Sequence, residues 1–133
     1  MTDTQASHIT VTQKESGAEV TCIYAISKDV RREMEVWSSK KHPTNQDLLV
    51  WLVNKGCRLD SASRPAVVRR DSDGSTMEQY YRDGKLHRDD GPAMICHNPN
   101  DGVTQEKYYR NGAFVKVEYR QPDSSLSAPT DGR

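Results

Sequence analysis

The sequence has few aromatic and apolar residues and no long hydrophobic run. Of its 133 residues, 34% are hydrophobic and 7% are aromatic. No stretch approaches the roughly 20 apolar residues of a membrane span, and residues 1–7 lack the basic-then-apolar order of a signal peptide. We therefore expect one small domain that stays in the cytoplasm and does not associate with a membrane.

The sequence also lacks an excess of either charge and has few cysteines. Nineteen Lys and Arg residues balance nineteen Asp and Glu residues, which argues against a strongly basic nucleic-acid binder and against an acidic DNA mimic. The three cysteines, Cys22, Cys57 and Cys96, are widely separated and form no CxxC pair. This spacing is atypical of a disulfide framework or a zinc site, so we expect free, buried thiols, no metal and no other cofactor.

Both ends of the chain are poor in apolar residues. Segments 1–7 and 121–133 are rich in Ser, Thr, Asp, Pro and Gly, so burial cannot offset the entropy of ordering them, and we expect both to be disordered. Between them we expect a single α+β domain over 8–120. Its first part, 8–60, is predicted to be a β-hairpin followed by two helices, and its second part, 61–120, a series of hairpins.

The first part shows strand signals and then helix signals. Two β-prone runs, 9–12 and 20–26, flank a Glu-Ser-Gly loop, which predicts a hairpin. Ser27 is the expected N-cap of a helix that ends near Pro43, and Thr44 with Asp47 resembles the capping box of a second helix. We expect the two tryptophans, Trp37 and Trp51, to be core residues that fasten these helices to a sheet.

The second part contains an internal repeat. Segments 65–84 and 92–112 share a Pro-Ala start, a central Asp-Gly and a Tyr-Tyr-Arg run that leads to Asp83-Gly84 or Asn111-Gly112. These dipeptides tolerate the positive φ angles of two-residue hairpin turns. The repeat therefore predicts an antiparallel β-meander.

Strand alternation assigns the repeated side chains to the two faces of this meander. Tyr80 and Arg82 share one face, and Tyr81 lies on the other, so each Tyr-Tyr pair contributes one ring to each face. The last strand, 113–119, places most of its apolar residues on one side, which predicts that it has an inner face.

Residues 80–93 carry a recognisable motif. They read Tyr-Tyr-Arg-Asp-Gly-Lys-Leu-His-Arg-Asp-Asp-Gly-Pro-Ala, which resembles the W/Y-Y-x-N/D-G-x-x-H-R-E/D-D-G-P-A repeat of phage and bacterial proteins, a relative of the MORN repeats. The earlier copy has Ser63-Arg64 in place of Asp90-Gly91. The resemblance implies an elongated sheet of about two stacked hairpins that binds partners; it implies no reaction.

His87 and Asp89 are the first candidates for chemistry. A histidine base and an orienting carboxylate could serve in a small hydrolase. In a recurring turn, however, the carboxylates of Asp89 and Asp90 are more often acceptors of backbone N–H bonds, and His87 and Arg88 more often bridge neighbouring hairpins. Cys96 and His97 are adjacent on a strand and point to opposite faces, which disfavours a shared metal ion.

The tyrosines and basic residues of the repeat are the second group of candidates. Such a surface can bind phosphates and stack on bases, but acidic residues in the same segment balance its positive charge. Tyrosine and arginine among mixed charges are also typical of protein interfaces. The candidate partner-binding residues are Tyr80, Arg82, Lys85, His87, Arg88, Tyr108 and Arg110.

These observations favour a binding protein over an enzyme. We expect no catalytic residues and a function in binding a protein complex of a host cell. Because the resemblance is to phage proteins, one specific expectation is a phage or mobile-element inhibitor of a host defence complex, such as an anti-CRISPR protein that occludes a binding site of a CRISPR effector. Alternatives are a nucleic-acid-binding module and the hydrolase. The open edge of a short sheet also allows a homodimer.

Overall fold

The computed structural model describes residues 7–61 and 63–122. The two helices are α1 (Lys28–Lys41) and α2 (Asn45–Asn54). The strands are β1 (Ser7–Glu15), β2 (Ala18–Ile26), β3 (Arg58–Leu59), β4 (Val67–Arg70), β5 (Thr76–Gln79), β6 (Tyr81–Arg82), β7 (Lys85–Leu86), β8 (Met94–His97), β9 (Thr104–Arg110) and β10 (Ala113–Arg120).

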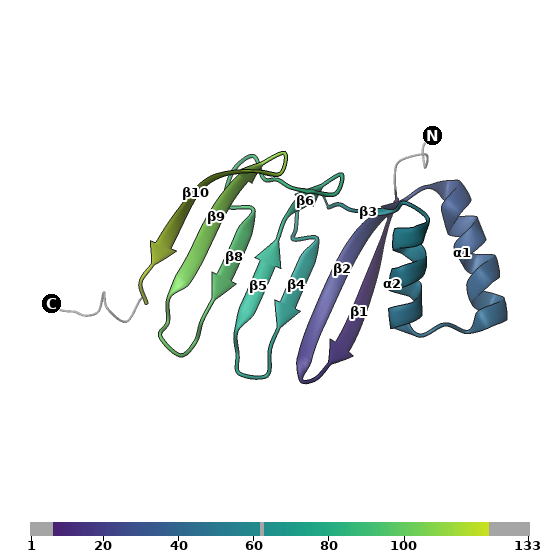
Figure 1. Ribbon diagram of the computed structural model, residues 1–133, viewed down its shortest axis with the longest axis horizontal. Coiled ribbons are helices and arrows are strands. Elements are labelled where there is room, and N and C mark those ends of the chain that lie inside the picture. Colours follow the sequence, from purple (N-terminus) through teal and green to yellow (C-terminus); the bar gives the residue numbers. More distant parts are fainter. Residues whose placement is uncertain (1–6, 62, 123–133) are drawn as a thin grey trace, which may run out of the picture.

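The strands form one long antiparallel meander. Its order is β1-β2-β4-β5-β8-β9-β10, with β3 paired to β2, while β6 and β7 form a separate two-stranded ribbon. Both helices lie at the β1 end, so most of the sheet has no helix over it (Figure 1). The α+β fold with a β-meander is therefore confirmed, and neither helix in the described chain is long and apolar enough to span a membrane.

The local sequence explains both helices. The Ser27 side chain accepts a hydrogen bond from the Val30 N–H at 3.2 Å, as an N-cap does. At the start of α2, Thr44 and Asp47 exchange side-chain and backbone hydrogen bonds, each of 3.1 Å. The predicted helix starts are confirmed.

The hydrophobic core is small and lies under the helices. Its cluster at α2 comprises Val11, Tyr24, Ile26 and Leu52, and the side chains of Ile26 and Leu52 are fully buried. Trp51 packs against this cluster, and Trp37 stacks on Trp51 with ring centroids 5.2 Å apart. Both indoles are only half-buried, whereas core residues were expected at these positions. Trp37 contacts Trp51, and this stack holds α1 against α2.

The predicted turns have the expected backbone geometry. Asp83 and Gly84 have φ angles of 51° and 83°, and Asn111 and Gly112 have φ angles of 50° and 85°. Two consecutive positive φ angles are the mark of a two-residue hairpin turn that matches strand twist. The two copies of the repeat therefore reverse at the positions that the sequence predicts.

The structure reveals a third unit that the sequence analysis missed. β2 pairs with β3 through Tyr24 opposite Leu59, in the same way that β6 pairs with β7 through Tyr81 opposite Leu86. The backbone N–H of Ile23 donates to Ala66 O at 2.7 Å, as that of Tyr80 donates to Ala93 O at 2.7 Å. The N-terminal hairpin is thus another unit of the array, and α1 and α2 are inserted where the other units have a two-residue turn.

Two expectations about the chain ends need correction. β1 begins at Ser7, which the sequence analysis placed in a disordered segment; the rest of that segment, and 123–133, lie outside the described residues. β10 has no inner face, because all its residues are exposed. A bulge shifts its register with β9 between Phe114 and Lys116 and so breaks the alternation on which the expectation depended.

A candidate interaction surface at the hairpin ends

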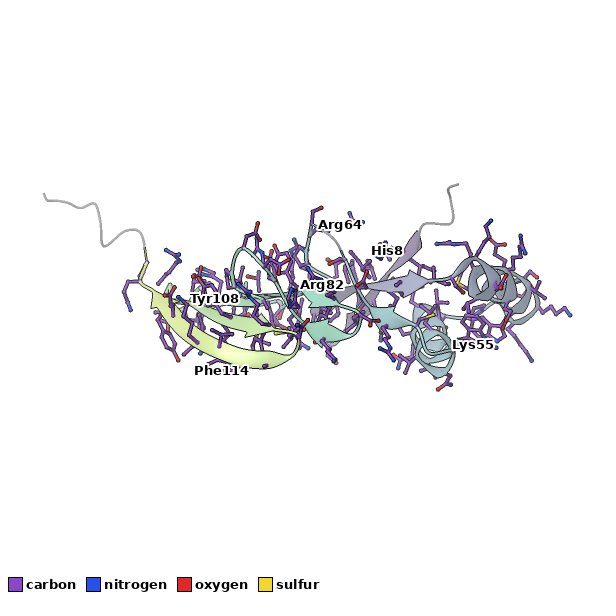
Figure 2. The ribbon with its side chains drawn as sticks, turned by 90° about the horizontal axis from the view of Figure 1, so that it is seen from above. His8, Lys55, Arg64, Arg82, Tyr108 and Phe114 are labelled. Atoms are coloured by element: carbon purple, nitrogen blue, oxygen red, sulfur yellow. The ribbon has the colours of Figure 1, made fainter. Side chains whose placement is uncertain are left out.

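Most of the predicted binding residues line the two hollows beside the exposed carboxylate of Asp89, whereas Lys85 lines a different hollow, with Arg58 and Leu59. Arg82 and Lys85 lie on the β6–β7 ribbon, His87 and Arg88 follow that ribbon, and Tyr108 and Arg110 lie on β9. Figure 2 shows Arg82 and Tyr108 on the side of the sheet away from Phe114. We call Arg82, Arg88, Asp89 and Arg110, which share these hairpin ends, the hairpin-end surface.

His87 is the anchor of this surface. Its side chain is buried, and its Nδ1 accepts a hydrogen bond of 2.9 Å from the backbone N–H of Asn111. Because a backbone N–H can only donate, Nδ1 carries no proton, and Nε2 therefore donates to Asp89 Oδ1 at 2.9 Å. The imidazole thus links the β9–β10 turn, through Asn111, to the segment that follows β7, through Asp89.

The preceding unit uses a different side chain for the same contact. Asp60 precedes β4 at the position that corresponds to His87, and its Oδ1 accepts from the backbone N–H of Asp83 at 2.8 Å. In both units the neighbouring glycine N–H also donates to the previous strand, Gly84 to Leu59 O and Gly112 to Leu86 O, each at 2.8 Å. What the position requires is a hydrogen-bond acceptor, which either side chain provides.

Asp89 connects His87 to two arginines. Its Oδ2 accepts from Arg82 Nη2 at 2.7 Å, and its backbone carbonyl accepts from Arg110 Nη2 at 3.2 Å. The hydrogen bond from Arg82, followed by that from His87, lowers the pKa of the Asp89 carboxyl below its ordinary value. This carboxylate was predicted to accept backbone N–H bonds; instead it accepts from the side chains of Arg82 and His87.

The guanidinium of Arg88 lies over the ring of Tyr80. Its guanidinium carbon is 4.0 Å from the ring centroid, and its Nη1 donates to Pro92 O at 3.2 Å. A Cβ atom at Gly91 would approach the same guanidinium to 3.1 Å. The glycine of the Asp-Asp-Gly-Pro-Ala turn therefore makes room for Arg88.

Tyr108 is covered in a similar way by the next strand. Lys116 on β10 places its ammonium 4.7 Å from the Tyr108 ring centroid, and the Tyr108 hydroxyl donates to Glu118 at 3.3 Å. Both tyrosines that the sequence analysis placed on the binding face are thus half-buried beneath a cation.

Two hollows flank the arginines. One has a volume of about 350 Å³ and lies between Tyr80, Arg82 and Arg88; the other, of about 500 Å³, lies between Tyr108, Arg110 and Lys116. Arg88 and Asp89 line both hollows. The surface is therefore corrugated and carries both charge signs.

The chemistry of the remaining candidates is limited. Both ring nitrogens of His87 are engaged with the protein, and no group of three or more metal-ligating side chains occurs within 7–61 and 63–122. The thiols of Cys22, Cys57 and Cys96 are free and half-buried, and burial raises the pKa of each. The surface is suited to non-covalent contacts.

The burial of the candidate residues differs from what their predicted roles require. His87, expected to contact a partner, is 6% exposed and instead positions its neighbours. Arg82, Lys85 and Arg110 are exposed, while Arg88 and the two tyrosines are half-buried. Asp60 and Lys116 also belong to the site but were not predicted from the sequence. Aligning Asp60 with His87 at the repeat offset would have identified the first, whereas the second depends on the bulge in β10.

Comparisons of this chain with known proteins complete the description of the site. Comparisons with protein-family models, with curated proteins and with solved structures find no match. The function of the site is therefore inferred from its geometry.

Proposed function

We propose that the chain is a non-catalytic protein-binding module whose hairpin-end surface docks onto a larger partner. The observation that carries this proposal is the network that holds the arginines in place. Arg82 and Arg110 are exposed, yet each donates a hydrogen bond to Asp89, which His87 fixes in turn. Side chains ordered before binding lose less entropy when a partner binds.

The composition of the surface supports a protein partner. Arginine and tyrosine are enriched among the residues that contribute most to protein interfaces, where planar guanidinium groups form paired hydrogen bonds with carboxylates. Lys85 adds a further exposed cation beside Asp83, so charges of both signs alternate along the hairpin ends. Such a pattern favours a partner with complementary local charges.

The same contacts count against nucleic acid as the principal ligand. Bases stack on open aromatic faces, whereas the rings of Tyr80 and Tyr108 already have Arg88 and Lys116 over them. Binding dominated by phosphate contacts would also weaken steeply as the salt concentration rises. A titration of a short duplex at two salt concentrations distinguishes this alternative.

A more specific proposal concerns the partner. The motif of residues 80–93 resembles repeats of phage proteins, and we propose that the chain is a phage or mobile-element inhibitor that acts in the cytoplasm of the host. Its partner would be a host defence complex such as a CRISPR effector, and the hairpin-end surface would occlude a binding site on it. This step depends on the resemblance and on the surface chemistry together.

The test compares two charge-reversal variants in bacteria whose CRISPR system targets a phage. The chain is expressed, plaques are counted, and the effector is captured on tagged chain. Arg82→Glu/Arg110→Glu should lose plaque recovery and capture. Arg32→Glu, which alters an exposed arginine on α1, away from the hairpin-end surface, should retain both. Capture by the double variant at the wild-type level, with both variants folded, would contradict the proposed surface.

A further inference from the structure

We propose that the chain forms a homodimer in which β10 pairs, antiparallel, with β10 of a second copy about a two-fold axis at Val117. The two sheets would then form one continuous sheet. This inference is independent of the proposed function, because it depends on the free edge of β10 and not on a partner protein.

The opposite edge of the sheet is closed by the helices. The side chain of Asn45, at the start of α2, donates to the backbone carbonyl of Thr12 in β1 at 2.6 Å. Arg31 of α1 donates to the carbonyl of His8 in the same strand at 3.1 Å. Strand addition needs such backbone groups to be free, so the helices block growth of the sheet beyond β1.

The β10 edge has no such protection. No strand lies beyond β10 in the part of the chain that the structure describes, and all residues of β10 are exposed. Four of them are large and apolar, with exposed fractions between 37% and 60%: Phe114, Val115, Val117 and Tyr119. An edge strand with this composition favours pairing with another strand.

The charges of β10 select a second copy and a register. A two-fold axis perpendicular to the sheet keeps equivalent faces continuous and passes through a residue that faces its own copy. Two such registers overlap nearly the whole of β10. With the axis at Lys116, two ammonium groups face each other. With the axis at Val117, Lys116 of each copy faces Glu118 of the other, which is favourable.

The side chains are already arranged for the second register. Lys116 Nζ lies 3.2 Å from Glu118 Oε2 within the chain, and Tyr108 donates to the same carboxylate. In the dimer the four charges alternate in sign around the axis. Val117 faces its own copy across the axis, so apolar surface is buried on the face opposite the charges.

Sedimentation velocity over a concentration series tests the dimer. The wild type should show a dimer fraction that increases with concentration. Lys116→Glu and Glu118→Lys should each remain monomeric, because like charges then face each other, while an equimolar mixture should form a heterodimer. Lys40→Glu on α1 is the matched control and should dimerise as the wild type does.

Three results would overturn the proposal. A wild type that is monomeric at every concentration would exclude the homodimer and would favour pairing of β10 with a strand of a different protein. Dimers of Lys116→Glu or Glu118→Lys as stable as the wild-type dimer would exclude the register. Failure of the mixture to form a heterodimer, with both variants folded by circular dichroism, would exclude the charge pairing.

Discussion

Replacing His87 with alanine tests whether the imidazole anchors successive turns. The substitution leaves the Asn111 N–H without its acceptor, a loss of about 1–3 kcal/mol. It also removes a ring that is 6% exposed. Together these effects should lower the free energy of unfolding by about 2–4 kcal/mol. At roughly 3–6 °C per kcal/mol for a domain of this size, Tm should fall by about 10 °C.

Two companion variants make this measurement specific. His87→Asn retains an oxygen acceptor near the Asn111 N–H and should recover at least half of the loss in Tm. His97→Ala is the control, because His97 is half-buried on β8 and its Nδ1 shares a hydrogen bond of 2.9 Å with the hydroxyl of Thr104, not with a turn. Differential scanning calorimetry measures all three. A Tm for His87→Ala equal to that of the wild type would refute the anchoring role and would revive the hydrolase alternative.

Three further predictions concern the acid range, the thiols and the core. Because the pKa of Asp89 is lowered in the folded state, its contribution to stability is present above its ordinary pKa and disappears as the pH falls through the folded value. The stability difference between wild type and Asp89→Asn, measured by urea unfolding, should thus shrink below about pH 4; a difference constant down to pH 2 would contradict it. Burial raises the pKa values of Cys22, Cys57 and Cys96, so iodoacetamide at pH 7.5 should alkylate them far more slowly in the native than in the urea-unfolded protein, and equal rates would show that the thiols are open. Leu52→Ala in the core should cost about 2–5 kcal/mol in urea unfolding, whereas the exposed Val53→Ala should cost less than about 0.5 kcal/mol; similar losses would place the core elsewhere.

Local chemistry was sufficient to predict the repeated turns and the helix starts. Asp83-Gly84 and Asn111-Gly112 tolerate positive φ angles wherever they occur, and Ser27 and Thr44 cap the nearest free N–H groups. These signals depend on a few neighbouring residues and need no knowledge of the tertiary structure.

Long-range pairing could not be predicted in the same way. β3 joins β2 although α1 and α2 separate them in the sequence, and only the spatial register shows that they form a unit of the array. The burial of His87 was also missed, because it depends on the Asn111 turn, which lies 24 residues away. The predicted inner face of β10 is absent because β10 is the last strand of the sheet and all its residues are exposed. The bulge in addition shifts which of its side chains share a face.

The central claim is that equivalent acceptors, Asp60 and His87, fix successive turns into the rigid array that carries the hairpin-end surface. The most direct test of this claim is the rate of hydrogen exchange at the backbone amides of Asp83 and Asn111, measured by NMR. Both amides should be protected in the wild type. His87→Ala should accelerate exchange at Asn111 alone, and Asp60→Ala at Asp83 alone. Exchange of both wild-type amides at the rate of an unfolded chain would contradict the account.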